Sequence, residues 1–147
     1  MEKMMLNGDN WKMQIVGENI YGITPEEMPA VIPGSVYGNL LSRGLIPDPF
    51  DGMNELTALK LMENDFRFRI TFTLSRQQVE SDFLLLRFDG IDTLADIYLN
   101  DVWIGHVDNM HRVWEFAIEE TARVGENELR VEIASPTRFI EAENQKV

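Results

Sequence analysis

The sequence contains no cysteine and only two histidines. The absence of cysteine excludes disulfide bonds, thiol nucleophiles and thiolate metal ligands, and it agrees with the reducing cytoplasm, where we expect the protein. No apolar run approaches the roughly eighteen residues that a membrane-spanning helix needs. The first residues also lack the apolar segment of a secretory signal, so we expect no such signal.

Basic residues are scarce, with 13 Lys and Arg against 25 Asp and Glu, and the formal net charge is −12. Such a surface repels the phosphates of nucleic acids and anionic membranes, so neither is an expected partner. A neutral ligand such as a sugar is indifferent to this charge. Solubility alone is a sufficient reason for it.

The second half of the chain has the pattern of β-strands. From Phe66 to Leu74, apolar residues alternate with arginine and threonine, which predicts a strand with one buried face. The run Phe83–Phe88 is nearly all apolar and predicts a strand covered on both faces. Asn100-Asp101 is typical of a tight hairpin turn. Further strands are predicted at 95–99, 102–107, 113–118 and 129–133.

The first half is less regular. Trp11–Val16 predicts a strand, and Thr24–Glu27 resembles a capping box that starts a single helical turn. Ser35–Arg43 predicts a helix that Ser35 caps and Gly44 ends. Short strands separated by turn signals favour an all-β sandwich over residues 1–136, with one or two short helices. The polar residues 137–147 are expected to form a linker or tail.

Three groups of residues, in this order and spacing, resemble the N-terminal sugar-binding domain of β-mannosidase-like enzymes of glycoside hydrolase family 2. The resemblance covers about nine-tenths of the chain, and the second group separates mannosidase-like members from galactosidase-like and glucuronidase-like ones. The groups are Leu6-Asn7-Gly8 with Trp11; Val31–Val36, Leu40-Leu41, Gly44–Phe50 and Asn54-Glu55; and Phe88–Thr93, Tyr98–Asn100, Gly105, Asn109–His111, Gly125–Asn127 and Ser135-Pro136.

The resemblance implies a jelly-roll β-sandwich of the galactose-binding-domain-like kind. It also implies a parent enzyme that hydrolyses terminal β-linked mannose with two glutamates on a (β/α)₈ barrel, a fold that takes roughly 250 residues. We therefore expect this chain to hold no catalytic residue, to need no cofactor, to be inactive alone and to have the barrel as its partner. The family continues with a Gly-Trp-Asp-Trp-Gly-Pro segment after the Ser-Pro pair, so we expect the last strand to be missing.

Some positions depart from the family's pattern, and they leave the sugar open. The family has a tryptophan where this chain has Leu59-Lys60-Leu61, and its Asp-Trp-x-Tyr motif appears as Asp65-Phe66-Arg67-Phe68. Its hairpin Asn-Gly appears as Asn100-Asp101. The aromatic substitutions keep a packed face, so they bear on sugar identity more than on the fold.

The loop from Pro47 to Glu55 is the main candidate for sugar contact. The resemblance implies that this loop reaches toward the barrel, with Asn54 near the sugar hydroxyls. An amide suits that task because it offers a donor and an acceptor together. Asn54 and Glu55 could equally hold the loop or contact the barrel. The resemblance places Asn109 and His111 in another loop, where they are further candidates.

The three tryptophans are candidate platforms for a sugar ring. Trp11 is expected in the core, as is Trp114, which shares a strand face with Phe116 and Ile118. Trp103 follows the hairpin turn, and its role stays open. The spacing of His106, Asp108 and His111 suggests zinc, but no fourth ligand is evident and nothing orients the rings, so no metal site is predicted.

Three functions agree with the sequence. The first is a non-catalytic domain that supports the barrel, lends a loop to the substrate cleft and binds sugar weakly by itself. The second is an independent carbohydrate-binding module, and the third is an assembly surface made by an unpaired sheet edge. Saturable sugar binding by the isolated chain would favour the second function over the first.

Overall fold

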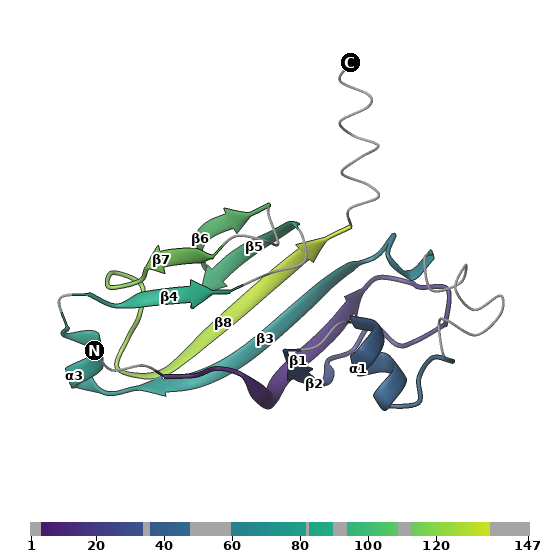
Figure 1. Cartoon of the computed structure of the whole chain (residues 1–147), viewed down its shortest axis with the longest axis horizontal. Coiled ribbons are helices and arrows are strands. Elements are labelled where there is room, and N and C mark those ends of the chain that lie inside the picture. Colours follow the sequence, from purple (N-terminus) through teal and green to yellow (C-terminus); the bar gives the residue numbers. More distant parts are fainter. Residues whose placement is uncertain are drawn as a thin grey trace, which may run out of the picture. The chain divides into compact units, whose positions relative to one another are not determined.

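The computed structural model describes residues 4–33, 36–47, 60–81, 83–89, 94–108 and 113–135, and Figure 1 shows their elements. The chain divides into two compact units. The first unit holds Met1–Arg67 and Ala134–Val147, and the second holds Phe68–Ile133. The chain passes from one unit to the other inside two strands, β3 (Asp65–Leu74) and β8 (Gly125–Ala134). No helix in the described residues is long and apolar enough to cross a membrane.

The first unit is built on two antiparallel strands, β1 (Gly8–Val16) and β2 (Met28–Ile32). Trp11 lies opposite Ala30 in this pair, and Met13 lies opposite Met28. All four side chains are buried, so the strands share one apolar face. The expected strand at Trp11–Val16 is therefore confirmed and starts three residues earlier. Trp11 is a core residue, as predicted, and its indole N–H donates to the carbonyl of Leu6 at 2.6 Å.

Helix α1 (Val36–Ser42) follows β2 and confirms the helix predicted for Ser35–Arg43, with each end within one residue of the predicted one. Leu40 is fully buried, and Gly44 adopts φ +70° just after the last turn, a conformation that glycine tolerates. The buried side chain of Asn39 joins this helix to β2. Its Oδ1 accepts from the backbone N–H of Val31 at 2.7 Å, and its Nδ2 donates to the carbonyl of Val31 at 3.3 Å. The amide thus bonds both backbone polar groups of Val31 in β2, which is the outer strand of its sheet in the described residues.

The second unit contains most of β3 and β8 and the remaining elements. Its strands run in the order β3-β8-β5-β6 in one sheet, and β4 and β7 form a separate two-stranded sheet. The elements not yet given are α3 (Arg76–Val79), β4 (Leu85–Phe88), β5 (Leu94–Leu99), β6 (Val102–Val107) and β7 (Trp114–Ala117).

The β5–β6 hairpin confirms the predicted turn. Asn100 and Asp101 adopt φ 52° and 65°, the left-handed values that a tight two-residue hairpin turn requires. The pairing shifts by one residue between Ile97 and Tyr98, so Asp96 lies opposite His106 and Tyr98 lies opposite Trp103. This register places the four side chains on one face, while Ile97 and Leu99 point to the core.

The core of the second unit requires a glycine on β6. A Cβ at Gly105 would lie 2.1 Å from one ring atom of Phe116 and 2.8 Å from two others, so the ring occupies the space that a side chain would need. Phe116 also contacts Phe88 edge-to-face, with ring centroids 6.2 Å apart. Because the Phe116 ring of β7 packs directly against β6, only glycine fits at position 105.

Two predictions were wrong in the described residues. Thr24–Glu27 forms bends instead of a helical turn. The Asn19 carboxamide holds the preceding turn by accepting from the N–H groups of Tyr21 and Ile23, and Gln14 donates to the carbonyl of Pro25 at 2.8 Å. These bonds keep the segment extended as it enters β2.

The second wrong prediction concerns β4, which was expected to be covered on both faces. Phe83 is 78% exposed and Leu85 is 49% exposed, while Leu86 is buried. The strand pairs only with β7, and one face packs on the core. Trp114 and Phe116 share a face of β7, as predicted, but both are only half-buried, so Trp114 is not the core residue that was expected.

Candidate functional site

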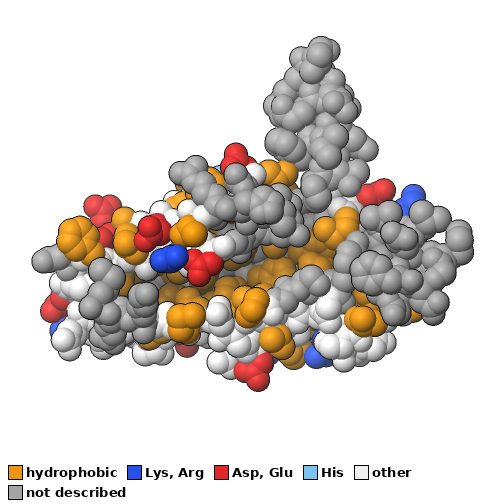
Figure 2. Space-filling view, in the orientation of Figure 1, with side chains coloured by type: hydrophobic (Ala, Val, Ile, Leu, Met, Phe, Trp, Pro, Cys, Tyr) orange, Lys and Arg blue, Asp and Glu red, His pale blue; other side chains and the backbone are white. Residues whose placement is uncertain are grey.

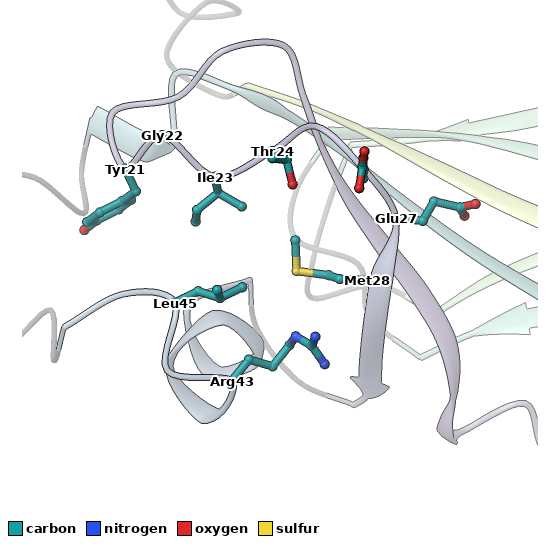
Figure 3. Close-up of a pocket in the computed structure, with 9 residues that line it drawn as sticks. Tyr21, Gly22, Ile23, Thr24, Glu27, Met28, Arg43 and Leu45 are labelled. Carbon is teal, nitrogen blue, oxygen red and sulfur yellow. The ribbon is translucent and has the colours of Figure 1, made fainter.

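The first unit contains a hollow of about 470 Å³ between the segment before β2 and the residues after α1 (Figure 3). Ile23 and Met28 point toward Leu45 across it, and Arg43 reaches toward β2. The full lining is Tyr21, Gly22, Ile23, Thr24, Glu26, Glu27, Met28, Arg43 and Leu45.

The hollow is lined by both apolar and polar side chains. Ile23, Met28 and Leu45 give it hydrocarbon surface, while its carboxylates and the Arg43 guanidinium belong to solvent-exposed residues. It lies next in sequence to the start of the loop that the resemblance implicates, because Pro47 follows Leu45 by two residues. This arrangement suits contact with a neutral polar molecule or with a protein surface better than it suits chemistry.

A second surface lies on the outward face of the β5–β6 hairpin, and we call its residues Asp96, Tyr98, Trp103 and His106 the Trp103 face. The Trp103 indole N–H donates to Asp96 Oδ1 at 3.0 Å, and His106 Nδ1 lies 3.0 Å from the same oxygen. Trp103 is 56% exposed, whereas Trp11 is buried. The exposed indole is therefore fixed at its polar end.

A cluster of charges borders this face. The Arg130 guanidinium lies 4.5 Å above the Tyr98 ring and donates a hydrogen bond to Asp101. Its Nε is 3.0 Å from Glu132 Oε1, close enough for an ion pair but not aligned for a hydrogen bond. Partial burial opposes the charged form of Arg130, yet the Asp101 hydrogen bond and the nearby carboxylates outweigh it and raise its pKa. This cation is already neutralised.

Acidic side chains elsewhere are scattered and form no patch on the face shown in Figure 2. Among the described residues, no group of three or more His, Cys, Asp or Glu side chains is placed to hold a metal ion. Of the residues whose spacing suggested zinc, His106 contacts Asp96, and His111 lies outside the described residues.

Trp103 alone of the five predicted sugar-contacting residues lies in the described part of the chain. Asn54, Glu55, Asn109 and His111 lie outside it and stay predictions. Sequence reasoning did not group Trp103 with Asp96 and His106. A regular two-residue hairpin pairs Asp96 with Gly105, and only the observed register shift brings His106 opposite Asp96. Nothing in the sequence pattern marks that shift.

Comparison with known proteins gives one family and consistent relatives. The family model for the glycosyl hydrolase 2 galactose-binding domain-like family matches residues 11–147. The β-mannosidase of Mus musculus is 34% identical over 123 residues, which is 81% of this chain. The crystal structure of β-D-mannosidase from Dictyoglomus thermophilum covers 100% of this chain with a TM-score of 0.91 and 35% identity. A β-glucuronidase from Bifidobacterium dentium covers 88% with a TM-score of 0.62 and 25% identity.

The shared part is a small fraction of each relative. This chain spans 13% of the length of the mouse protein, 17% of the Dictyoglomus enzyme and 19% of the Bifidobacterium enzyme. The mostly strand content, the antiparallel sheets and the few short helices, together with the Dictyoglomus match, confirm the predicted all-β jelly-roll sandwich.

Proposed function

The chain belongs to the glycosyl hydrolase 2 galactose-binding domain-like family, and we propose that it is the non-catalytic N-terminal domain of a β-mannosidase-like glycoside hydrolase. In this role it supports a catalytic barrel and lends a loop to the substrate cleft. The match to the Dictyoglomus β-D-mannosidase carries the proposal, because it includes all of this chain but only 17% of the enzyme.

The side chains around the hollow support a non-catalytic role. A glycosidase needs two carboxyl groups on either side of the scissile bond, about 5 Å apart in retaining enzymes, and the acid needs a pKa raised by burial. Among the described residues, Glu26 and Glu27 are the carboxylates that line the hollow, and both are exposed. Glu27 points away from it (Figure 3). We therefore assign hydrolysis of terminal β-linked mannose to the parent protein's barrel.

The first of the proposed sugar contacts come from the loop that starts at Pro47. We propose that Asn54 binds sugar hydroxyls through its amide and that Glu55 either assists or holds the loop. Trp103, Asn109 and His111 complete the proposed set. The hollow at the start of this loop supports the assignment by offering a surface on which another part of the parent protein can pack. A cysteine-free sequence supports a cytoplasmic location.

The 147-residue chain alone is expected to show no turnover of p-nitrophenyl β-D-mannoside above the buffer rate, because the part of the chain that the structure describes positions no pair of carboxyl groups at its hollow. Release of p-nitrophenol measures this, with the intact Dictyoglomus enzyme as the positive control. Turnover that saturates with substrate and co-purifies with the chain would show that it carries its own catalytic site and would overturn the proposal.

A further inference from the structure

Trp103 is a large aromatic side chain that the fold leaves exposed and yet holds in place. We propose that the Trp103 face binds the pyranose ring of a neutral carbohydrate, with the ring stacked on the indole. This site rests on the proposed function, which counts Trp103 among the sugar contacts, and it deepens that function by naming the residues beside Trp103 and the way the ring is held. All of these residues lie in the second unit.

The indole is oriented before any ligand arrives. Its N–H donates to Asp96 on the facing strand, and the same carboxylate oxygen contacts His106. The three residues come from one hairpin, so the cross-strand register sets their separation. A ring fixed in this way loses little rotational freedom on binding, which removes a cost that a freely rotating side chain carries.

The polar atoms beside the ring suit hydroxyl groups. Within the described residues, Oδ2 of Asp96 and Nε2 of His106 make no hydrogen bond. A carboxylate oxygen accepts from a hydroxyl, while an imidazole nitrogen donates or accepts according to its tautomer. The apolar C–H side of a pyranose fits the exposed indole face, and its hydroxyls reach these two atoms at the edge.

The charges around the Trp103 face favour a neutral ligand. An anionic ligand needs an available cation, but Arg130 is engaged by Asp101 and Glu132, and the chain carries a net charge of −12. A basic peptide needs several uncommitted carboxylates, and those of Asp101, Glu128 and Glu132 surround Arg130. A neutral sugar needs neither.

The test is a titration of the 147-residue chain with β-1,4-mannotetraose, followed by ¹H–¹⁵N correlation NMR. The chain has three tryptophans, so three indole N–H signals report separately, and Trp103→Phe identifies the one from Trp103. We expect that signal to shift saturably with a Kd of about a millimolar, as suits one ring on an open face. The buried Trp11 signal should stay in place.

Two variants locate the site. Trp103→Ala should weaken binding about tenfold or more because the stacking surface is lost, whereas Trp103→Phe should retain part of the affinity. Val102→Ala is the matched control, since Val102 is also exposed, on the same strand, and is not part of the Trp103 face. It should leave the Kd unchanged. Unfolding midpoints of all variants establish that they are folded.

Four results would overturn the site: no saturable shift of the Trp103 signal, binding that survives Trp103→Ala, binding of D-glucuronate as tight as that of the neutral sugar, or a shift that depends on protein concentration without sugar. The last would identify the face as a contact between copies of this chain. None of these results bears on whether the chain supports a catalytic barrel, which turnover measurements test separately.

Discussion

Replacing Asn127 with alanine is expected to lower the free energy of unfolding by about 3 kcal/mol or more. The side chain is fully buried and uses both ends of its amide. Nδ2 donates to the carbonyls of Arg123 and Gly125 at 2.8 and 3.1 Å, and Oδ1 accepts from the N–H of Arg123 and from Asn100 Nδ2, both at 2.9 Å. Alanine leaves these partners without an acceptor or donor at a fully buried position.

The loss extends beyond one turn because Asn127 and Asn100 form one network. Asn100 lies at φ 52° in the β5–β6 hairpin, and its side chain donates to the carbonyl of Thr121 and accepts from the N–H of Glu128. The two amides thus join the hairpin turn to the segment that leads into β8. Removing one amide loosens both, so the cost exceeds that of a single hydrogen bond.

Urea unfolding of the wild type and variants measures this effect through the midpoint at constant m-value. Glu126→Ala is the matched control, because Glu126 is the exposed neighbour and should change stability by less than about 0.5 kcal/mol. Asn127→Asp should be nearly as damaging as alanine, since it turns the Nδ2 donor into an oxygen that faces two carbonyls. Equal midpoints for wild type and Asn127→Ala would contradict the role of this network.

Asn39→Ala is expected to destabilise the first unit by about 2 kcal/mol. The variant leaves the N–H and carbonyl of Val31 without the amide that satisfies them, and it separates α1 from the edge of β2. Met28 lies in β2, and Arg43 and Leu45 directly follow α1 at the hollow, so the variant should also disturb the start of the proposed functional loop.

The rate of hydrogen exchange at the Val31 amide, combined with the urea midpoint, measures the effect of Asn39→Ala most directly. Faster exchange at Val31 is expected in Asn39→Ala. Ser42→Ala is the control: Ser42 is exposed on the same helix, and its hydroxyl donates to the carbonyl of Asn39, so its loss should change little. Unchanged protection of the Val31 amide in Asn39→Ala would show that α1 is held to β2 by other contacts.

The sequence predicts the strands best where local pattern and packing agree. In β3 the alternation from Phe66 onward matches the burial of Phe66, Phe68 and Ile70. At Asn100-Asp101 the turn chemistry dictates the hairpin whatever surrounds it. Composition alone could not show that β4 pairs with β7 in a separate two-stranded sheet. The apolar run Phe83–Phe88 therefore led to the wrong prediction that both faces of the strand are buried.

Two elements were missed for different reasons. β2 is short and contains Pro29, which discourages a strand prediction. It is the outer strand of the sheet, beside β1, and an outer strand tolerates a proline because one of its sides needs no ladder hydrogen bond. Helix α3 has a capping box in plain view, with Ser75 accepting from the N–H of Gln78 and Gln78 accepting from the N–H of Ser75. That signal was available in the sequence. The Trp103 face was not, because it depends on a register shift that only the folded hairpin reveals.

Domain replacement tests the accessory role most directly. The segment of Dictyoglomus thermophilum β-D-mannosidase that superposes on this chain is replaced by this chain, and the product is compared with the same enzyme lacking the segment. The graft is expected to hydrolyse p-nitrophenyl β-D-mannoside with a kcat/KM within about a hundredfold of the native enzyme, a loss of less than about 3 kcal/mol in transition-state stabilisation. The deletion should be inactive. A graft that folds but is as inactive as the deletion would contradict the proposal that this chain supports a β-mannosidase-like barrel.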